Sequence, residues 1–328
     1  MNPLSIKTTE GVNYNGDITT SILDSAQNHH INFAYSCKNG QCGVCKTTLL
    51  QGEVIELQVQ TELTDVDRKN KKILTCCCAP KTDILIDAED LSALQGIEIK
   101  TLPVRINQIL KLTDHIVEVE LRLPPTAEFI FLEGQFIDVI APQGVRRSYS
   151  IANSNEEKTI RLFIKKVENG ILSQYWFHEA KVNDLLRIEG PKGSFFFRKP
   201  KRNIIFMATG TGIAPVKAIL DKLAETSDSF SATSFSLYWG NRKIEDFFWK
   251  PNYSSLDLNY VPVLSREHEA WQGRVGYIQD AVVADGLSMN DTQVYACGSL
   301  PMIESASAML VKNGLEEKEF YADAFVSS

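Results

Sequence analysis

Long apolar runs are missing from this chain, and so is a segment that would act as a secretion signal. No stretch of its 328 residues approaches the roughly 18 consecutive apolar residues that a membrane-spanning helix requires. The first ten residues contain no long apolar segment either, so we expect the seven cysteines to be free thiols in a reducing cytoplasm. Internal repeats and low-complexity tracts are also absent.

The chain has no excess of positive charge. It carries 34 Lys and Arg against 41 Asp and Glu, which gives a net charge of −7 and a pI near 5.4. A general nucleic-acid binder would present a basic face, so this class is not expected. The content of 44% hydrophobic and 23% charged residues is ordinary for a globular protein. The length allows two or three domains of about 100–200 residues each.

What the chain does contain is a distinctive spacing of cysteines. Cys37, Cys42 and Cys45 form C-x4-C-x2-C, and Cys76 follows about thirty residues later. This is the ligand spacing of a plant-type [2Fe-2S] ferredoxin. Gly40 and Gly43 lack the Cβ that would obstruct a close approach of the loop to inorganic sulfide. A zinc site would usually show two short paired spacings instead, so we predict an iron–sulfur cluster.

Residues 1–92 combine short strands with short helices, as expected of a β-grasp ferredoxin domain. A helix is predicted over residues 20–29, with Ile22, Leu23 and Ala26 on one face. An acidic turn is expected to begin at Thr64. The predicted strands are residues 4–8, 46–50, 53–57 and 84–87.

Residues 93–101 are expected to form a linker, and residues 102–199 are rich in strands broken by Pro and Gly. One helix is predicted there, over residues 171–180. The predicted strands are residues 104–110, 115–123, 135–140, 148–152, 159–167 and 185–189. Many short strands of this kind indicate a small antiparallel barrel.

From residue 202 to residue 328 the pattern changes to short apolar strands that alternate with helices. The predicted strands are residues 203–208, 235–239, 260–264, 294–297 and 320–324. Strand–helix alternation predicts a doubly wound parallel sheet. The predicted fold class is therefore multidomain, α+β and α/β.

Two segments of the strand-rich region carry residues suited to a flavin. Arg147 could pair with a pyrophosphate, the ring of Tyr149 could pack on an isoalloxazine, and the Ser150 hydroxyl could donate to flavin N5. Taken alone, R-x-Y-S could also be a polar strand end. Gly170 and Ser173 begin a helix whose free N–H groups could bind a pyrophosphate, although a simple capped helix would look the same.

Residues 209–215, T-G-T-G-I-A-P, directly follow a predicted strand. Gly210 and Gly212 would let a pyrophosphate approach the backbone. Pro215 replaces the third glycine of the Rossmann fingerprint and suits a first helical turn.

These motifs, in the order iron–sulfur domain, barrel and nucleotide sheet, resemble the ferredoxin–NADP reductase superfamily over essentially the whole chain. The resemblance implies that the barrel binds FAD and the parallel sheet binds NADH, or alternatively NADPH. It implies catalytic roles for Ser150 and Cys297. The implied cofactor-binding residues are Arg147, Tyr149, Ser150, Ile164, Gly170, Leu172, Ser173, Gly210, Thr211, Gly212, Pro215, Gly240, Arg242, Gly298 and Phe325.

The resemblance leaves several alternatives open in the nucleotide region. Arg242 and Lys243 could accept a 2′-phosphate, Glu245 or Asp246 could accept a ribose hydroxyl, and a solvated charge cluster is equally consistent with the sequence. The superfamily places a cysteine beside the nicotinamide C4, which would be Cys297, although a free cysteine is often just a small buried side chain. Phe325 could lie against the flavin or pack in the core.

Among the consecutive cysteines 76–78, Cys76 matches the superfamily's final ligand segment. Cys77 and Cys78 are then expected to be packing residues.

Shorter strings resemble the reductases that serve CDP-6-deoxy-hexulose 3-dehydrases in 3,6-dideoxysugar and O-antigen biosynthesis. These strings are residues 35–38, 73–77, 122–127, 146–153, 295–300 and 323–326. Reductases of phenol and methane hydroxylases are similar in domain order. The resemblance therefore implies an electron-acceptor protein, namely a pyridoxamine-phosphate-dependent dehydrase or, as the alternative, an oxygenase.

We predict a three-domain oxidoreductase with a [2Fe-2S] ferredoxin domain (1–92), an FAD-binding barrel (102–199) and an NAD(P)-binding domain (202–328). Electrons from the reduced nicotinamide are expected to reach the partner by way of FAD and the cluster. A non-enzymatic electron carrier is the alternative, and the intact loop at residues 209–215 argues against it.

Overall fold

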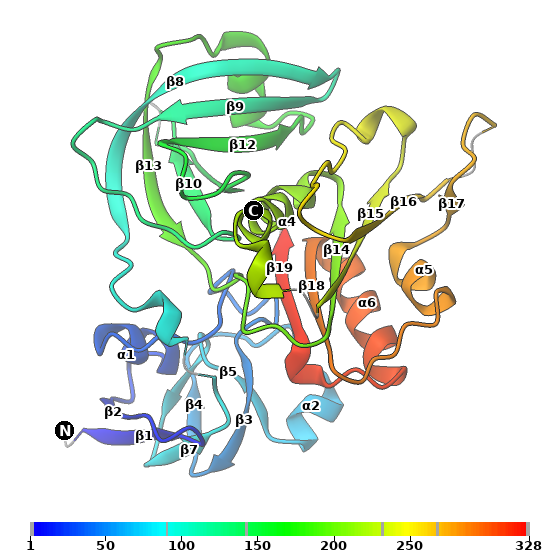
Figure 1. Ribbon diagram of the computed structural model, residues 1–328. Helices are drawn as coiled ribbons and strands as arrows, with labels where there is room; N and C mark the ends of the chain where they lie inside the picture. Colours follow the sequence, from blue (N-terminus) through cyan, green and yellow to red (C-terminus); the bar gives the residue numbers. More distant parts are fainter. Residues whose placement is uncertain (1–2, 90, 142–143, 231–232, 267–268, 326–328) are drawn as a thin grey trace. The chain divides into compact units, whose positions relative to one another are not determined.

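The computed structural model describes residues 3–89, 91–141, 144–230, 233–266 and 269–325, which form two compact units. Unit 1 lies within residues 1–97, and unit 2 comprises residues 98–325 (Figure 1). The barrel and the parallel sheet both belong to unit 2. The predicted boundaries of three separate domains therefore stay predictions.

Unit 1 is built on a five-stranded mixed sheet in the order β2-β1-β7-β3-β5. β1 pairs with β7 in parallel, and the other neighbours are antiparallel. The strands are β1 (Leu4–Thr8), β2 (Asn13–Gly16), β3 (Lys46–Gln51), β5 (Lys72–Leu74) and β7 (Ile84–Ile86), with β4 (Val54–Glu56) and β6 (Cys78–Pro80) forming a separate pair. The ferredoxin part of the predicted fold class is confirmed.

The helices of unit 1 begin at side-chain caps. The Ser21 hydroxyl accepts from the Asp24 amide at 3.0 Å and starts α1 (Ile22–Asn28), which buries its apolar side chains in the core of the unit. Thr64 and Asp67 form a reciprocal capping box at α2 (Asp65–Lys69). A short 3-10 helix follows at Ser92–Leu94.

The first part of unit 2 is an antiparallel barrel of six strands in the order β11-β10-β13-β8-β9-β12. An antiparallel bridge between Ile151 and Leu162 joins the two outer strands, β11 and β12. The strands are β8 (Lys100–Thr113), β9 (Ile116–Arg122), β10 (Phe136–Ile140), β11 (Arg146–Ser150), β12 (Thr159–Lys165) and β13 (Leu185–Lys192). The predicted barrel is confirmed, but β8 begins inside the expected linker and β11 begins two residues before the expected strand.

The one helical segment of the barrel changes character along its length. One α-helical turn, α3 (Ile171–Gln174), runs into a π-helix at Tyr175–Glu179. Trp176 is buried within that second segment.

The second part of unit 2 is a six-stranded parallel sheet in the order β17-β16-β15-β14-β18-β19. Its first strand is the apolar run Asn203–Thr209, which is almost entirely buried because helices cover both faces. The strands are β14 (Asn203–Thr209), β15 (Ser234–Asn241), β16 (Leu258–Leu264), β17 (Arg274–Val275), β18 (Thr292–Ser299) and β19 (Phe320–Phe325). The predicted doubly wound sheet is confirmed.

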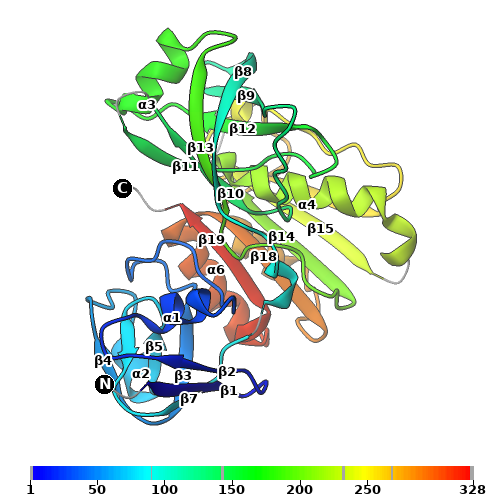
Figure 2. The same ribbon diagram turned by 90° about the vertical axis from the view of Figure 1, so that its left-hand side faces the viewer.

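Helix α4 (Ile213–Glu225) covers one face of the sheet, and α5 (Ile278–Ala284) and α6 (Leu300–Lys312) cover the other (Figures 1 and 2). The chain leaves β14 toward β15 and later returns to the far side of β14 as β18. Right-handed crossovers in opposite directions put their helices on opposite faces. Short 3-10 helices lie at Gly210–Gly212, Ser227–Phe230, Ile244–Asp246 and Glu317–Glu319. Within the described residues, no helix is long and apolar enough to cross a membrane.

Candidate functional site

The four predicted cluster ligands lie in two close pairs within unit 1. The Sγ atoms of Cys45 and Cys76 are 3.3 Å apart, and the Cys37 amide donates to Cys42 Sγ at 3.5 Å. Across the described ranges, no three His, Cys, Asp or Glu side chains converge on one metal-ion position. Two pairs of thiols fit a site with two irons, each held by two protein thiolates.

Each pair shares a proton unevenly. A hydrogen bond from the Cys42 thiol lowers the pKa of Cys37 to about 5, and one from the Cys45 thiol lowers the pKa of Cys76 to about 7. The same bonds, together with burial, raise the pKa of Cys42 and Cys45. The thiolate is the form that binds metal, so binding of the cluster would release the thiol protons of both pairs.

Glycines shape the loop around these thiols. Gly40 has φ +78°, and a Cβ there would lie 2.5 Å from the Val59 carbonyl oxygen and 2.9 Å from Cys77 Sγ. Gly43 has φ +69°, and its Cβ would lie 2.7 Å from the Glu62 side chain. Both positions therefore favour glycine, and the loop fits the [2Fe-2S] group that its spacing predicts.

Cys77 and Cys78 are fully buried in the core of unit 1. Cys77 Sγ nevertheless lies 3.4 Å from Cys76 Sγ, so it is close to the proposed ligands. The assignment of Cys76 as the fourth ligand stays a prediction, and the contact between Cys76 and Cys45 supports it.

In unit 2, the glycine loop lies at the switch point of the parallel sheet, where β14 and β18 are neighbours but their crossovers diverge. Open α/β sheets bind ligands in the crevice at this point. A Cβ on Gly212 would collide with the carbonyl of Cys297, and one on Gly298 would collide with the Thr209 side chain. Glycine at both positions therefore lets the ends of the two strands come together.

In the loop between β14 and α4, the backbone has open space beside it at Gly210. Gly210 has φ +55°, and no atom lies within 4 Å of the place where its Cβ would be. Its carbonyl accepts a hydrogen bond from Trp239 Nε1 at 2.9 Å, which holds the loop against β15. Thr211 is half-buried, and Pro215 is buried in the first turn of α4. The open side of Gly210 leaves room for a pyrophosphate.

A buried carboxylate joins the two residues predicted to be catalytic. Ser150 Oγ donates to Asp323 Oδ2 at 3.4 Å, and Cys297 Sγ lies 3.9 Å from the same oxygen. Burial, and secondarily the Asp323 charge, raises the pKa of the Cys297 thiol, so the thiol stays protonated near neutral pH. Ser150 ends β11 of the barrel and Cys297 lies on β18 of the sheet, so flavin and nicotinamide candidates meet at Asp323.

The other flavin candidates on β11 differ in exposure. Tyr149 accepts a hydrogen bond from Trp176 Nε1 at 3.2 Å, and burial raises the pKa of Tyr149 to about 12. The phenol is therefore a neutral group held in place by an aromatic neighbour. Arg147 is exposed and, over the part of the chain that the structure describes, forms no ion pair with a carboxylate. Its Nη1 donates to the Arg146 carbonyl at 2.7 Å, and the remaining N–H groups of the guanidinium are available to a phosphate.

Comparison with known proteins identifies all three parts of the chain. Residues 7–81 match a 2Fe-2S iron-sulfur cluster binding domain, residues 103–197 an oxidoreductase FAD-binding domain, and residues 206–308 an oxidoreductase NAD-binding domain. The CDP-6-deoxy-L-threo-D-glycero-4-hexulose-3-dehydrase reductase of Yersinia pestis is 40% identical over 325 residues, which cover 97% of each chain.

The chain belongs to this family of iron–sulfur flavoprotein reductases. It is an oxidoreductase whose cofactors are FAD, a nicotinamide nucleotide and a [2Fe-2S] cluster. The phenol hydroxylase P5 protein of Acinetobacter pittii is 31% identical and covers 94% of this chain and 90% of its own. The solved ferredoxin reductase in carbazole 1,9a-dioxygenase superposes with a TM-score of 0.67 at 28% identity, covering 99% of each chain.

The other residues predicted to bind the flavin lie on β12 and around the start of α3. Ile164 and Leu172 are buried in the core of the barrel. Ser173 Oγ accepts a hydrogen bond from the Val167 amide at 2.8 Å, which holds the loop before α3 in place. The hydroxyl proton of Ser173 is not used in this bond and can still be donated. Gly170 caps α3 without a side-chain bond.

The charged residues that could bind the nucleotide, which follow β15, differ in their exposure and in their ion pairs. Arg242 is exposed, whereas Lys243 lies 3.4 Å from Glu245. Asp246 is buried and pairs with His115 of the barrel, so it is not placed to accept a ribose hydroxyl. Gly240 lies in β15, where a Cβ would meet Ile278 at 2.8 Å, and Phe325 is 40% exposed at the end of β19.

Sequence reasoning missed Asp323 as a functional residue. Asp323 is only 5% exposed. Aspartate is rarely buried without a partner, so a buried Asp323 has to contact other polar side chains. Asp323 is the first residue of the string Asp323-Ala324-Phe325, and that position was the one available signal. Its partners on β11 and β18 are 173 and 26 residues away in sequence, and only the fold brings them together.

Proposed function

We propose that this reductase passes electrons from NADH, or alternatively NADPH, to a pyridoxamine-phosphate-dependent CDP-6-deoxy-hexulose 3-dehydrase. The observation that carries the proposal is 40% identity over 97% of both chains to a reductase named for that dehydrase. The named relative from a phenol hydroxylase system is 31% identical over 94% of this chain. An oxygenase partner is therefore the alternative.

The proposed role of unit 2 is to hold the flavin and the nicotinamide in register. When bound, FAD and the cluster convert a two-electron hydride transfer into single-electron steps. Arg147 would neutralise the flavin pyrophosphate, and Tyr149 would pack on the flavin ring. Ser150 would turn its single hydroxyl proton from Asp323 to the edge of the flavin that receives hydride, and Asp323 would then accept from the thiol of Cys297 alone.

The nucleotide would lie at the switch point of the parallel sheet. Gly210, Thr211 and Gly212 would contact its pyrophosphate through backbone N–H groups, and Gly298 would let Thr209 pack against the end of β18 next to Cys297. Arg242 is the exposed cation available to the adenosine half.

The proposed setting is 3,6-dideoxysugar synthesis for lipopolysaccharide O-antigen in the cytoplasm. Seven free cysteines in the described part of the chain support a reducing compartment.

Reconstitution tests the proposal. The purified reductase is mixed with NADH and a purified CDP-4-keto-6-deoxyhexose 3-dehydrase, and loss of the 3-hydroxyl is followed. A parallel reaction replaces the dehydrase with a diiron hydroxylase, and a control uses Cys45→Ser to remove the cluster. We expect deoxygenation that depends on NADH and on the intact cluster. Turnover of the hydroxylase without deoxygenation would support the oxygenase alternative.

A further inference from the structure

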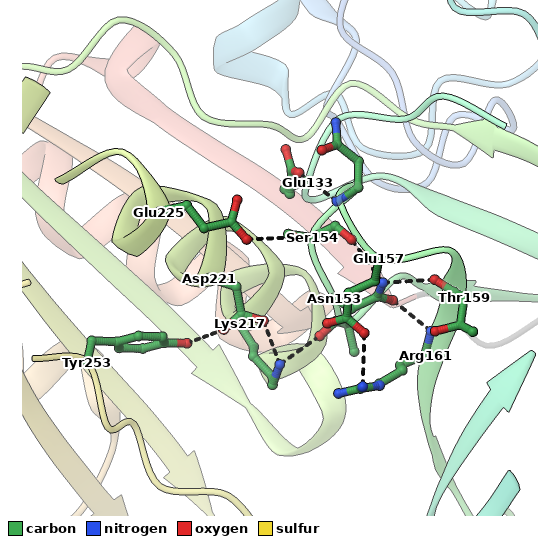
Figure 3. Close-up of polar contacts among 12 residues, drawn as sticks. Glu133, Asn153, Ser154, Glu157, Thr159, Arg161, Lys217, Asp221, Glu225 and Tyr253 are labelled. Carbon is green, nitrogen blue, oxygen red and sulfur yellow. Dashed lines mark hydrogen bonds and ion pairs between the residues drawn. The ribbon is translucent and has the colours of Figure 1, made fainter. Parts of the chain in front are cut away.

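A half-buried lysine on α4 reaches the backbone of the barrel within unit 2. Lys217 Nζ donates to the Ala152 carbonyl at 3.1 Å and to Asp221 Oδ2 at 2.6 Å (Figure 3). Asp221 in turn accepts from the Tyr253 hydroxyl at 2.6 Å. The side chain of Lys217 is only 14% exposed. A buried ammonium is costly unless it is paired, and here a carboxylate and a carbonyl share it.

The barrel segment that Lys217 contacts is itself well ordered by hydrogen bonds. Ala152 follows β11 and its amide donates to the Arg161 carbonyl at 2.8 Å. The Asn153 side chain donates to the Thr159 carbonyl at 2.9 Å and accepts from the Arg161 amide at 2.7 Å. These bonds attach residues 152 and 153 to β12, two residues beyond the end of β11 at Ser150.

A second contact holds the far end of the same helix to the same corner. Ser154 Oγ donates to Glu225 Oε1 at 2.9 Å (Figure 3). Lys217 and Glu225 lie two turns apart on α4, so the helix is attached to the corner at two points. The first turn of α4 continues directly from the loop Gly210–Gly212.

We propose that Lys217 is a positioning residue that sets the distance between the flavin strand and the nicotinamide loop. The inference rests on the proposed hydride transfer from the nucleotide to FAD. Ser150 is two residues from Ala152, and Gly212 is five residues from Lys217, so the bond from Lys217 to Ala152 is a short mechanical link between the two sites. A misplacement of about 1 Å can slow a reaction by about a hundredfold.

The competing interpretation is that Lys217 only stabilises α4 through its i,i+4 ion pair with Asp221. The two interpretations differ for two variants. Lys217→Met removes both bonds, whereas Asp221→Asn removes the charge partner and leaves the donor to Ala152. Helix stabilisation alone predicts similar, purely structural effects from both variants. Positioning predicts that only Lys217→Met slows hydride transfer.

The test measures flavin reduction by NADH at saturating nucleotide in anaerobic stopped flow, using the full-length chain. We expect Lys217→Met to lower the rate constant about tenfold or more, with FAD content and nucleotide affinity nearly unchanged, and Lys217→Arg to recover part of the rate. Asp221→Asn should stay within about threefold of wild type. Glu156→Gln is the control, because Glu156 also joins the barrel to α4, through Lys222 Nζ at 2.7 Å, but on the exposed side, and its loss leaves the ion pair between Lys222 and Glu225 in place.

Hydrogen exchange provides a readout that is independent of turnover. In Lys217→Met, but not in Glu156→Gln, peptides that contain Ala152 and Asn153 should exchange faster. A wild-type rate and wild-type exchange in Lys217→Met would overturn the inference. If Lys217→Met does not fold, Ser154→Ala is tested in its place. This variant removes the bond between Ser154 and Glu225, and flavin reduction should again be slower. A wild-type rate in Ser154→Ala would overturn the inference. If the wild-type chain itself is not reduced by either nucleotide, the proposed function fails instead.

Discussion

At the scale of single residues, the cysteines of unit 1 differ in what their sulfur atoms contact. Cys45 and Cys76 meet at 3.3 Å, and Cys37 and Cys42 form the second pair. Cys77 contacts Cys76, and Cys78 faces the core. The spacing C-x4-C-x2-C could be identified from the sequence because it lies in one loop. The choice among three consecutive cysteines could not follow from spacing alone.

Serine substitutions test this assignment. Serine at Cys37, Cys42, Cys45 or Cys76 should bleach most of the visible iron–sulfur absorbance, because an alcohol is a poor ligand for iron. Serine at Cys77 or Cys78 should leave the absorbance nearly intact. Loss of the cluster in Cys77→Ser, combined with a normal spectrum in Cys76→Ser, would move the fourth ligand to Cys77.

Arg147 and Arg146 are neighbours on β11 with different partners, which makes them a matched pair. Arg146 Nη1 lies 2.9 Å from Glu189 Oε2, whereas Arg147 is an exposed residue whose Nη1 donates to the Arg146 carbonyl. Arg147→Ala should weaken FAD binding by about 1.5–3 kcal/mol, roughly tenfold to a hundredfold in Kd, because the pyrophosphate loses a charged hydrogen bond. Arg146→Ala should leave the Kd unchanged. Equal losses in a flavin titration of the two variants would remove Arg147 from the site.

Ser150 is expected to act on the rate of hydride transfer and not on flavin affinity. Ser150→Ala should retain FAD but slow its reduction by NADH about tenfold or more, because a donor at the reacting edge is lost. Ser148→Ala is the control, since Ser148 lies on β11 like Ser150 but its hydroxyl donates to Asp138 of β10 at 2.6 Å. Rapid-mixing absorbance compares the two. A Ser150→Ala rate equal to that of Ser148→Ala would contradict the proposed role.

At the scale of elements, sequence patterns predicted the long strands better than their ends. The apolar runs of β14, β15 and β18 were found because strands buried on both faces carry continuous hydrophobic residues. β2, β5, β6 and β17 were missed because two to four residues are too few to show a period, whereas the equally short β4 and β7 were found within the longer predicted segments 53–57 and 84–87. The start of β8 at Lys100 was also missed, because pairing with β13 extends that strand into a segment with no apolar pattern.

The ends of β14 and β18 make a further prediction about two glycines of one loop. Gly210→Ala places a Cβ in open space and adds only left-handed strain, about 1–2 kcal/mol. Gly212→Ala would press a Cβ against the Cys297 carbonyl and force the two strands apart. We therefore expect the second substitution to lower the thermal midpoint clearly more than the first. Calorimetry on both variants checks this, and equal midpoints would show that the strands are not in close contact at Gly212.

At the scale of the whole molecule, unit 2 carries the proposed flavin and nicotinamide sites, and unit 1 carries the cysteine loop. Barrel and sheet could be predicted as separate patterns, but the contacts that join them could not. Ser150 meets Asp323, and Lys217 meets Ala152, across sequence separations of 173 and 65 residues. Such pairs depend on tertiary packing and leave no local signal in the sequence.

Because unit 2 contains its own core, residues 98–328 should fold without unit 1. This fragment should bind FAD and reduce ferricyanide with NADH, since both proposed sites are intact. It should fail to support the dehydrase, because the cluster is absent. Steady-state assays of both reactions check the expectation, with the full chain as control. Full support of the dehydrase by the fragment would mean that electrons leave directly from the flavin.

The order of electron flow is the central claim, and one measurement tests it most directly. The full chain is mixed with NADH without oxygen, flavin absorbance is followed in time, and samples are frozen for electron paramagnetic resonance of the cluster. We expect the flavin to be reduced first and the signal of the reduced [2Fe-2S] cluster to rise afterwards at the expense of the reduced flavin. A cluster signal that precedes flavin reduction, or a cluster that stays oxidised while the flavin is fully reduced, would contradict the proposed path.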